Sequence, residues 1–390
     1  MKVLVAVTDT KMGGITTSAV NFCNELSKRR NDVYFLDMSS EYLCDEFLDD
    51  TVKRGKLNGR SRFWNLRKSD LIKGNVFRRI LLSALGALKK ITNKSNRWNK
   101  LIFKRYKQFG EFDVAIAFRQ CSPCYSFVLD KVQAKKKIGF VHGELKYMGD
   151  ISSWKNYMIR FDKIAYVSNA VRDEFIAAFP ELKNNATTIY NMFNTSQILE
   201  LSKAAISPLF NSNVKNIITV ARLDNEYKRI NWIPEICKKL KKRCCVPFCW
   251  YIVGDGPDKE CLEQSIKELQ VADVLVILGA KKNPYAFLSK ADLSVLVSKS
   301  EAYPMTVIES FILEIPIVVT RFATIVEMMT DEKEGLIAES EQDDCVLKII
   351  EMLSNEKLYS QCKAYLAERD ISNQIPYQQF INAIDSEDRL

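Results

Sequence analysis

The chain has 390 residues, which is enough for two domains of ordinary size and too many for one typical core. Hydrophobic residues make up 47% and charged residues 27%, a composition that excludes a disordered or fibrous protein, and the net charge is +9. The apolar stretch at the N-terminus is too short for a signal peptide. No apolar run approaches the ~20 residues that span a bilayer. We therefore expect a cytoplasmic protein.

The cysteines predict neither disulfides nor a metal site. There are 11 of them and a single histidine, and without an export signal we expect reduced thiols packed as small apolar residues. Cys121 and Cys124 have the spacing of a redox or zinc motif but lack a second such pair. Cys244, Cys245 and Cys249 show no better ligand pattern and are expected in the core.

The first half alternates short apolar runs with helical or irregular segments. This alternation predicts an α/β unit with a doubly wound parallel sheet. A helix is expected at 15–29. Strands are expected at 2–7, 32–36, 113–118, 137–142, 163–168 and 187–190.

The second half repeats this rhythm after a polar segment at 195–215, where we place the domain boundary. The predicted domains are an N-terminal lobe at 1–200, a C-terminal lobe at 201–370, and a C-terminal helix at 371–390 that packs back on the first lobe. Strands are expected at 216–221, 249–254, 273–278, 293–297, 315–320 and 335–338. Helices are expected at 232–242, 258–269, 283–290, 305–313, 342–353 and 356–368.

A basic segment at 53–107 interrupts the first lobe. It holds eighteen Lys and Arg and a single acid, Asp70, so its charge exceeds that of the whole chain and the remainder is acidic. An apolar helical face is expected at 80–88. Nucleic acid, an anionic membrane surface or an acidic substrate could each explain this composition. Aromatic residues are interleaved with the charges: Phe63, Trp64, Phe77, Trp98, Phe103 and Tyr106.

Two glutamates, Glu301 and Glu309, follow the buried strand at 293–297. Pro304 between them suits the first turn of a helix, so Glu301 lies on a loop and Glu309 inside that helix. Ligands of open α/β sheets bind at the carboxyl ends of strands, and helix starts attract anions. The stretch therefore predicts a polar pocket beside a phosphate site.

Two cations follow the first strand of the second lobe. Arg222 and Lys228 suit a diphosphate, because arginine can bind two oxygens and lysine acts as a point charge. Ordinary charges on a solvated loop are the alternative. Gly254 and Gly256 allow a tight turn after the next strand, but Lys259 stands where a GxGxxG motif needs glycine, which counts against a dinucleotide-binding dehydrogenase.

In the first lobe, Gly13 and Gly14 stand where the first strand turns into the first helix and would let a ligand approach closely. A plain turn explains them nearly as well. His142 ends the strand at 137–142. Its position at a carboxyl end favours a functional role as much as a structural one.

Together these motifs resemble the retaining, nucleotide-sugar-dependent glycosyltransferases called glycosyl transferases group 1, which have the GT-B fold. The resemblance rests on ARLDNEYK, VGDGP and the segment LGAKKNPYAFLSKADLSVLVSKSEAYPMTVIES with its E-x7-E motif, and it covers residues 216–340. The first lobe resembles the family more loosely, through MGG, FVHGE, 168–175 and 190–194. The resemblance implies two Rossmann-like lobes facing each other across a cleft.

The family roles carry over by motif. Glu309 would accept hydrogen bonds from the ribose hydroxyls, and Glu301 would lie against the donor sugar. The implied catalytic residues are Glu301, His142, Arg222 and Lys228, with His142 contacting the sugar and the two cations stabilising the leaving diphosphate. The implied donor-binding residues are Gly13, Gly14, Arg222, Lys228, Gly254, Met305, Thr306, Val307 and Glu309. Ala302, Tyr303 and Pro304 replace the glycine-rich spacing often seen after the first glutamate.

The implied reaction is transfer of a sugar, from a UDP-sugar by family habit, with retention of anomeric configuration. No DxD pair ends a strand, so we expect metal-independent catalysis without a cofactor. The diphosphate itself could take the acceptor's proton, since no general base is evident. The implied acceptor is lipid-linked or a saccharide of cell-surface polysaccharide, capsule or glycolipid synthesis, met at the inner face of the membrane.

Two other functions remain open from the sequence. A GT-B sugar-nucleotide epimerase would share the same site but has little use for a basic aromatic segment. A nucleic-acid-binding protein could use 53–107, although no RNA-binding or helix-turn-helix signature accompanies the charge. We therefore expect no nucleic-acid partner.

Overall fold

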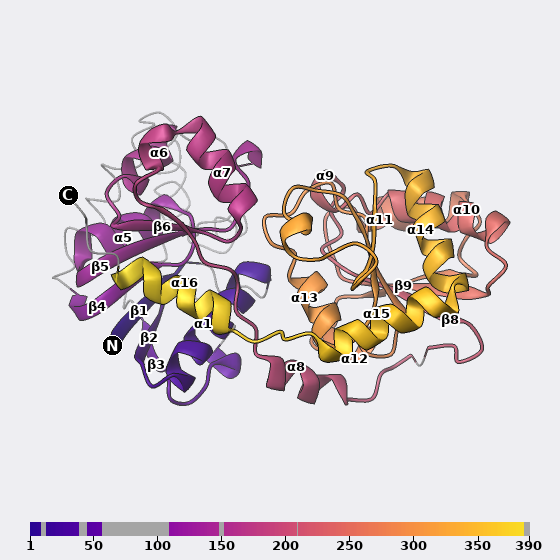
Figure 1. Cartoon of the computed structure of the whole chain (residues 1–390), viewed down its shortest axis with the longest axis horizontal. Helices are drawn as coiled ribbons and strands as arrows, with labels where there is room; N and C mark the ends of the chain where they lie inside the picture. The colour runs from indigo at the N-terminus through magenta and orange to yellow at the C-terminus, as the bar shows by residue number, and fades with distance from the viewer. Residues whose placement is uncertain (9–12, 39–44, 57–108, 148–151, 209, 386–390) are drawn as a thin grey trace, which may run out of the picture. The chain divides into compact units, whose positions relative to one another are not determined.

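The computed structural model describes residues 1–8, 13–38, 45–56, 109–147, 152–208 and 210–385. The chain divides into two compact units (Figure 1): unit 1 is Met1–Phe193 with Asn373–Leu390, and unit 2 is Asn194–Ser372. The sequence places these boundaries a few residues away, after 200 and after 370. The chain thus leaves unit 1 once and returns to it at its end.

Unit 1 is built on a seven-stranded parallel sheet in the order β3-β2-β1-β4-β5-β6-β7. The central strands are continuous apolar runs because helices cover both faces, and every residue from Val3 to Val7 is fully buried. The strands are β1 Lys2–Val7, β2 Asp32–Asp37, β3 Lys53–Lys56, β4 Phe109–Ala117, β5 Val132–Val141, β6 Lys163–Tyr166 and β7 Ala186–Thr188.

Strand β3 is a difference from the sequence prediction, which places residues 53–56 in the basic segment. It pairs in parallel with β2 at the edge of the sheet. Lys53 pairs with Asp32 at 2.7 Å, and its ammonium lies over the ring of Tyr34. A charged edge strand lacks the apolar pattern of a central one, which explains why it was missed. The rest of the basic segment, with the aromatic and apolar features predicted there, lies outside the described residues.

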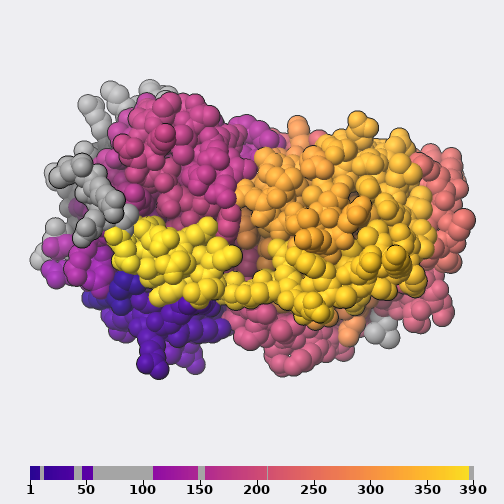
Figure 2. All heavy atoms as spheres, in the orientation of Figure 1, coloured from indigo at the N-terminus to yellow at the C-terminus, as the bar shows by residue number. Residues whose placement is uncertain are grey.

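The C-terminal helix α16, Gln374–Asp385, belongs to unit 1. It packs against α1, Gly14–Lys28, through an edge-to-face contact of Phe380 with Phe22. Asn373, just before α16, donates to the carbonyl of Phe193 at 2.8 Å. In Figure 2 this yellow segment covers part of the surface of unit 1. The other helices of unit 1 are α5 Ser122–Lys131, α6 Ser152–Met158 and α7 Asn169–Ala178, with 3₁₀ turns at Asp45–Phe47, Leu145–Tyr147 and Pro180–Leu182.

Unit 2 is built on a six-stranded parallel sheet in the order β10-β9-β8-β11-β12-β13. All six strands lie where the sequence predicts them, within a few residues at each end. They are β8 Lys215–Val220, β9 Phe248–Val253, β10 Leu275–Gly279, β11 Leu293–Leu296, β12 Ile317–Thr320 and β13 Gly335–Ala338.

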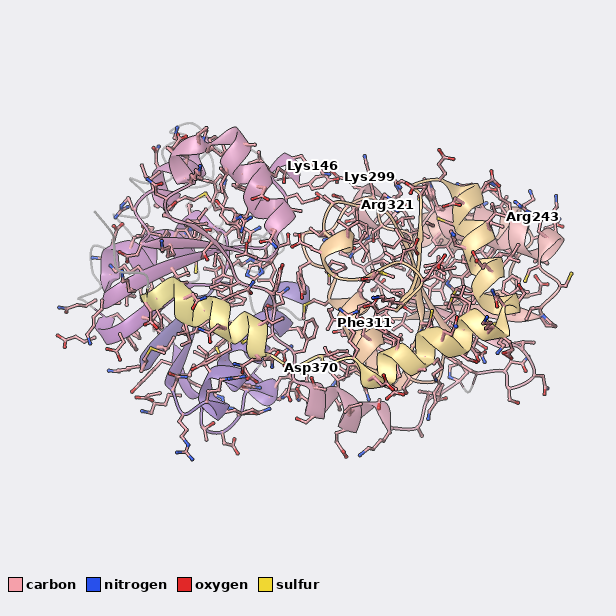
Figure 3. The ribbon with its side chains drawn as sticks, viewed as in Figure 1. Lys146, Arg243, Lys299, Phe311, Arg321 and Asp370 are labelled. Carbon is pink, nitrogen blue, oxygen red and sulfur yellow. The ribbon has the colours of Figure 1, made fainter. Side chains whose placement is uncertain are left out.

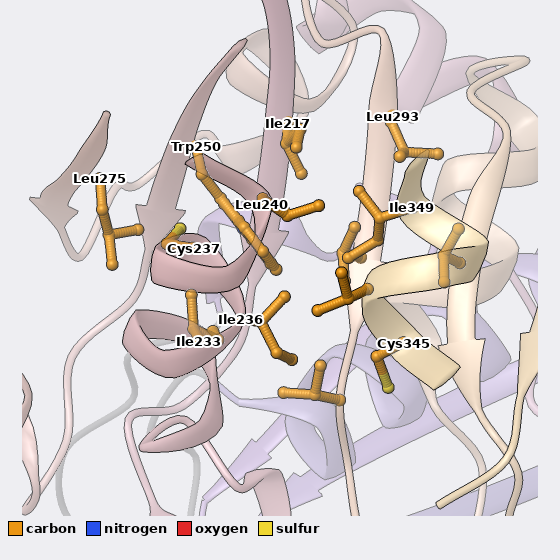
Figure 4. Close-up of a cluster of buried hydrophobic side chains, with 14 of the residues drawn as sticks. Ile217, Ile233, Ile236, Cys237, Leu240, Trp250, Leu275, Leu293, Cys345 and Ile349 are labelled. Carbon is orange, nitrogen blue, oxygen red and sulfur yellow. The ribbon is translucent and has the colours of Figure 1, made fainter. Parts of the chain in front are cut away.

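The helices of unit 2 cover both faces of its sheet. Helices α10 and α14 pack on one face (Figure 4), where Ile233, Ile236 and Leu240 recur at helical spacing toward Trp250 of β9. The helices are α8 Thr195–Ser202, α9 Asn225–Lys228, α10 Trp232–Arg243, α11 Lys259–Glu268, α12 Pro284–Leu288, α13 Met305–Ile312, α14 Gln342–Ser354 and α15 Glu356–Glu368, with a 3₁₀ turn at Ile325–Glu327.

Both units are Rossmann-like, as predicted. In each sheet the first strand in chain order lies between the second strand and the fourth. Thus β1 lies between β2 and β4, and β8 lies between β9 and β11, so the strand order reverses at the first strand. Ligands of such sheets bind where the strand order reverses, at the carboxyl ends of the strands. In unit 2, a ligand site is therefore expected at the carboxyl ends of β8 and β11.

The prediction that the cysteines pack in the core is wrong in part. Cys245 and Cys261 are exposed rather than packed as core thiols, and Cys244 and Cys249 are half-buried. Cys245 lies in the loop between the end of α10 and the start of β9. It is therefore exposed, although neighbouring residues are apolar. Among the helices that the structure describes, none is both long and apolar enough to cross a membrane.

Candidate functional site

The loops that follow β8 and β11 meet at the carboxyl edge of the unit 2 sheet. The amide of Lys299, in the loop after β11, donates to the carbonyl of Tyr227 in α9 at 2.8 Å. The hydroxyl of Thr306, at the start of α13, donates to the carbonyl of Val220 at the end of β8, at 3.1 Å. These bonds hold the segments carrying the predicted site residues side by side. Figure 3 labels Lys299, and also Arg321 after the neighbouring strand β12.

Glu301 and Lys228 form an ion pair between these two loops. The side chain of Glu301 is 12% exposed and that of Lys228 is 24% exposed, so the pair is shielded but open to solvent on one side. Ser298, which is buried, donates its hydroxyl to the same carboxylate oxygen at 2.7 Å. The hydroxyl of Thr324 donates to the backbone carbonyl of Glu301 at 2.7 Å. The carboxylate is thus held both by its side chain and by its backbone.

Glu309 lies inside α13 and is buried. The hydroxyl of Tyr285, from α12, donates to its carboxylate at 3.2 Å. Burial raises the pKa of Glu309 to about 7, and the bond from Tyr285 opposes this rise only in part. Burial also raises the pKa of Tyr285, so its phenol stays protonated and remains a donor. A buried carboxyl with a perturbed pKa at a strand edge is typical of a functional site.

Arg222 lies just beyond β8 and is the most exposed of the predicted site residues in unit 2, with 66% of its side chain accessible. It pairs with Asp224 at 3.1 Å. Asp224 is buried and caps α9 by accepting from the amide of Glu226 at 3.0 Å. Asp224 therefore positions both the short helix that carries Lys228 and the guanidinium group of Arg222.

The glycines of VGDGP have a packing role. A methyl group on Gly254 would lie 1.8 Å from the carbonyl oxygen of Ala221, and one on Gly256 would lie 2.2 Å from that of Leu223. Both positions must lack a side chain because the loop after β9 passes directly beside the loop that carries Arg222. The role of Gly254 in donor binding stays a prediction.

The start of α13 is less open than the sequence suggests. Pro304 precedes the helix as its N-cap residue, with Met305 first in the helix. The amide of Val307 donates to the carbonyl of Pro304 at 3.2 Å, and Val307 is buried. Of the three predicted amide donors, Met305 and Thr306 are the half-buried ones.

In unit 1, Gly13 and Gly14 stand at the start of α1, and both are exposed. Among the described residues, a methyl group on Gly14 would meet no atom within 4 Å. Their contact with a phosphate remains a prediction.

His142 follows β5 and packs against the rings of Phe118 and Phe140. Its Nε2–H donates a hydrogen bond to the carbonyl oxygen of Phe118 at 2.8 Å, and its backbone amide donates to the side-chain oxygen of Gln120 at 2.6 Å. Burial lowers the pKa of His142 to about 3. The neutral ring therefore keeps Nδ1 as an acceptor, which suits a sugar hydroxyl, and the ring cannot act as a general acid near neutral pH.

Cys121 precedes α5 as its N-cap residue without a side-chain capping bond, and its sulfur lies 3.0 Å from the hydroxyl of Thr8 just after β1. Cys124 is buried and donates to the carbonyl of Ala6 at 3.2 Å. In the described part of the chain, no group of three or more His, Cys, Asp and Glu could hold a metal ion. Metal independence stays a prediction.

A cavity of about 550 Å³ lies elsewhere in unit 2. Its lining includes Arg369, Glu334 and Tyr365 and none of the predicted site residues. Arg369 pairs there with the buried Glu334 and stacks on Phe311. This cavity is therefore separate from the carboxyl edge of β8 and β11.

Sequence reasoning missed four residues that shape the site: Tyr285, Ser298, Thr324 and Asp224. Tyr285 carried the clearest signal, because it stands in the first turn of a helix that follows strand β10 after an Asn-Pro pair. The others are small polar residues whose partners are set by strand order. No local pattern distinguishes them.

Residues 203–369 match the family model described as Glycosyl transferases group 1. This range contains strands β8 to β13 and all the predicted site residues of unit 2. Unit 2 is a glycosyl transferases group 1 domain. In this group 1 domain, Glu301 and Glu309 are the pair expected from the E-x7-E motif.

The chain is also similar to named proteins over part of its length. An uncharacterized glycosyltransferase of Methanocaldococcus jannaschii is 26% identical over 168 residues, which is 42% of this chain and 41% of that protein. The O-antigen biosynthesis glycosyltransferase WclY of Escherichia coli is 26% identical over 178 residues, 45% of this chain and 48% of that protein. The chain matches no more than about half the length of these relatives.

Solved structures extend the likeness over both units. HepE of Anabaena, in complex with UDP and glucose, covers 99% of this chain and 100% of its own, with a TM-score of 0.70 and 15% identity. A variant of S. aureus TarM, in complex with Fondaparinux, alpha-GlcNAc-glycerol and UDP, covers the same shares with a TM-score of 0.69 and 15% identity. Such likeness shows the fold, which is the predicted GT-B fold.

Proposed function

We propose that the protein is a retaining glycosyltransferase that moves a sugar from a nucleotide-sugar donor, a UDP-sugar, to a saccharide or lipid-linked acceptor. The observation that carries the proposal is the ion pair between Glu301 and Lys228 within a group 1 domain. The bond to be broken joins a sugar to a diphosphate. An acid that faces the sugar and a cation that faces the diphosphate must then be neighbours, and these two are.

Donor binding begins at Glu309 and Arg222. The carboxylate of Glu309, fixed inside α13, would accept hydrogen bonds from the ribose hydroxyls. Arg222, exposed beyond β8, would reach the diphosphate with its planar fork of donors. The start of α13 at Met305 and Thr306 would add its partial positive charge to the same phosphates.

Lys228 would stabilise charge as the donor bond breaks. When no donor is bound, Lys228 pairs with Glu301, so neither charge is left without a partner. The arriving diphosphate would compete for the ammonium, and charge that grows on the leaving oxygen would draw it further. The positive groups of the chain would thus stabilise the leaving diphosphate, as a divalent ion does in metal-dependent enzymes. The diphosphate would take the proton of the acceptor, which attacks from the same face of the sugar, so the anomeric configuration is retained.

Unit 1 would supply the acceptor side of the reaction. It would also meet the donor: Gly13 and Gly14 would border the phosphates, and His142, whose neutral ring has an acceptor nitrogen, would contact the donor sugar. The similarity to WclY, named for O-antigen biosynthesis, supports an acceptor in cell-surface polysaccharide synthesis. The basic residues of 53–107 support a peripheral site of action at the inner face of the cell membrane, where a lipid-linked acceptor or a capsule precursor would be met.

The test is an assay of the purified chain with a panel of nucleotide sugars and saccharide acceptors. We expect nucleotide release that depends on one donor and persists in EDTA, with the anomeric configuration of the product read by NMR. A product of inverted configuration would contradict retention. Donor epimerisation without transfer would instead identify an epimerase.

A further inference from the structure

The burial of the Glu309 carboxylate is energetically unfavourable. Glu309 is buried in the middle of α13, and within the described residues its pKa responds to two causes only, burial and the hydrogen bond from Tyr285. Helix α8 packs on α13, and its Glu200 is exposed and pairs with Lys203. An acid buried without a cation destabilises a fold, and buried acids with perturbed pKa values are typical of ligand sites.

Tyr285 is held firmly for a residue near a loop. It stands second in α12, and Asn283 caps that helix by accepting from the amide of Ala286 at 3.4 Å. The amide group of Asn283 also donates to the carbonyl of Leu201 at 2.7 Å, which ties α12 to α8. The phenol of Tyr285 thereby reaches Glu309 from a fixed backbone.

We propose that Tyr285 is the positioning residue of the nucleotide site: its hydroxyl holds one carboxylate oxygen of Glu309 so that the other faces the ribose diol of the donor. This inference rests on the proposed function and deepens it. A carboxylate has two acceptor oxygens, and a ribose diol that lies in one orientation needs one of them fixed. Tyr285 supplies this restraint without adding a positive charge that would compete with the ribose.

The restraint predicts a separation between binding and turnover. Tyr285→Phe removes one oxygen, leaves the ring in place, and frees the Glu309 carboxylate to rotate. We expect the donor KM to rise about tenfold, the loss typical of a hydrogen bond to a charged group, while kcat stays within about twofold. The affinity for UDP should fall by the same factor, because the ribose is common to donor and product.

A pH readout separates positioning from a general loss of structure. The bond from Tyr285 lowers the pKa of Glu309, whose folded value of about 7 lies within the working range. Without the hydroxyl the pKa rises further. The pH at which UDP affinity reaches its high-pH plateau should therefore move upward in Tyr285→Phe relative to the wild type, with UDP itself titrating equally in both proteins.

The experiment is calorimetric titration of the full chain with UDP and with GDP from pH 6 to pH 9. It compares the wild type, Tyr285→Phe, Glu309→Gln and the double variant. Tyr359→Phe is the matched control, because its hydroxyl donates to the backbone carbonyl of Asp292 at 3.1 Å in the same unit, away from the site. We expect the control to bind as the wild type does, and Tyr285→Phe to add little in the Glu309→Gln background.

Wild-type affinity and an unmoved pH midpoint in Tyr285→Phe would overturn the positioning role and leave the proposed function standing. Equal losses in Tyr285→Phe with and without Glu309→Gln would also overturn it, because Tyr285 would then act independently of Glu309. Failure of the wild type to bind either nucleotide would overturn the proposed function, and the inference with it.

Discussion

Lys228 and Glu301 lie 73 residues apart in the chain and form an ion pair at the carboxyl edge of the unit 2 sheet. They meet because β8 and β11 are neighbours in that sheet, so the loops that follow them are neighbours too. Ser298 and Thr324 fix the acid from two further directions. The pair is therefore a built feature of the group 1 domain rather than a chance surface contact.

The first prediction concerns the diphosphate contacts. Arg222→Ala and Lys228→Ala should each lower kcat by ~10²-fold, the effect of removing one preorganised electrostatic contact at a developing charge. Thermal unfolding should show both variants folded, and steady-state nucleotide release measures their turnover.

Lys241→Ala is the matched control for these two variants. Lys241 forms an exposed pair with Asp273 at 2.7 Å in the same unit, so its loss should change turnover by less than about twofold. Near-normal turnover in both Arg222→Ala and Lys228→Ala would refute the diphosphate assignment.

The second prediction concerns Ser298. Ser298→Ala removes the hydroxyl that holds the Glu301 carboxylate and should lower kcat by about tenfold, with little change in donor KM, because Glu301 is expected to act on the sugar. Glu301→Gln should lower kcat more strongly, since it also leaves Lys228 without its counter-charge. Kinetics under varied donor concentration separate kcat from KM.

Ser289→Ala is the comparison for Ser298→Ala. Ser289 donates to the carbonyl of Ser202 at 3.0 Å in the same unit, so the variant loses a similar bond away from Glu301. Equal kinetic effects in the two serine variants would mean that Ser298 is only structural.

The third prediction is a pH-dependent gain of stability in Glu309→Gln. Folding raises the pKa of Glu309 from 4.5 to about 7, so the folded state binds the proton more tightly than the unfolded state between these values. Stability from this group is full below pH 4.5 and falls as the pH rises through 7. At pH 8 the wild type should be less stable than Glu309→Gln by on the order of 3 kcal/mol, and at pH 4.5 the difference should vanish.

Denaturant unfolding at both pH values measures this difference. The same variant should bind UDP less well, so stability and function change in opposite directions. If Glu309→Gln gains the same stability at both pH values, folding does not raise the pKa of Glu309, and the prediction is contradicted.

The fourth prediction uses the fact that the chain has one histidine. Burial lowers the pKa of His142 from 6.5 to about 3, so the folded state should keep it neutral while the unfolded state takes up a proton below pH 6.5. Its stabilising contribution is full above 6.5 and is lost as the pH falls. The proton NMR signal of the ring in the untagged protein should therefore not shift between pH 8 and pH 5. A titration centred near 6.5 would contradict a neutral ring packed against Phe118 and Phe140.

The fifth prediction concerns the basic segment. Each Lys or Arg near an anionic surface contributes ~1 kcal/mol before screening, so the protein should sediment with anionic liposomes at low salt. Trp64, Phe77 and Trp98 should add an apolar contribution that salt does not remove. Binding that is equal on anionic and neutral liposomes, or absent from both, would contradict a membrane role. Salt-dependent binding to DNA alone would favour the nucleic-acid alternative.

Much of the fold was predictable from local patterns. The run from Leu293 to Val297 predicted a strand buried on both faces, and Pro304 predicted the start of the next helix, as the structure confirms. Such signals act over a few residues, because apolar periodicity and the backbone preference of proline are local properties. Strand β3 was missed for the same reason, since an exposed edge strand of charged residues carries no such pattern.

What the sequence by itself determined was the type of each group at the site: an acid on a loop, an acid in a helix, and cations after a strand. Only the tertiary structure decided their partners. The order of the strands brings Lys228 to Glu301, and the packing of α12 carries Tyr285 to Glu309. These pairings depend on contacts between residues far apart in the chain, which no local preference specifies, and on burial, which sets the pKa of Glu309 and of His142.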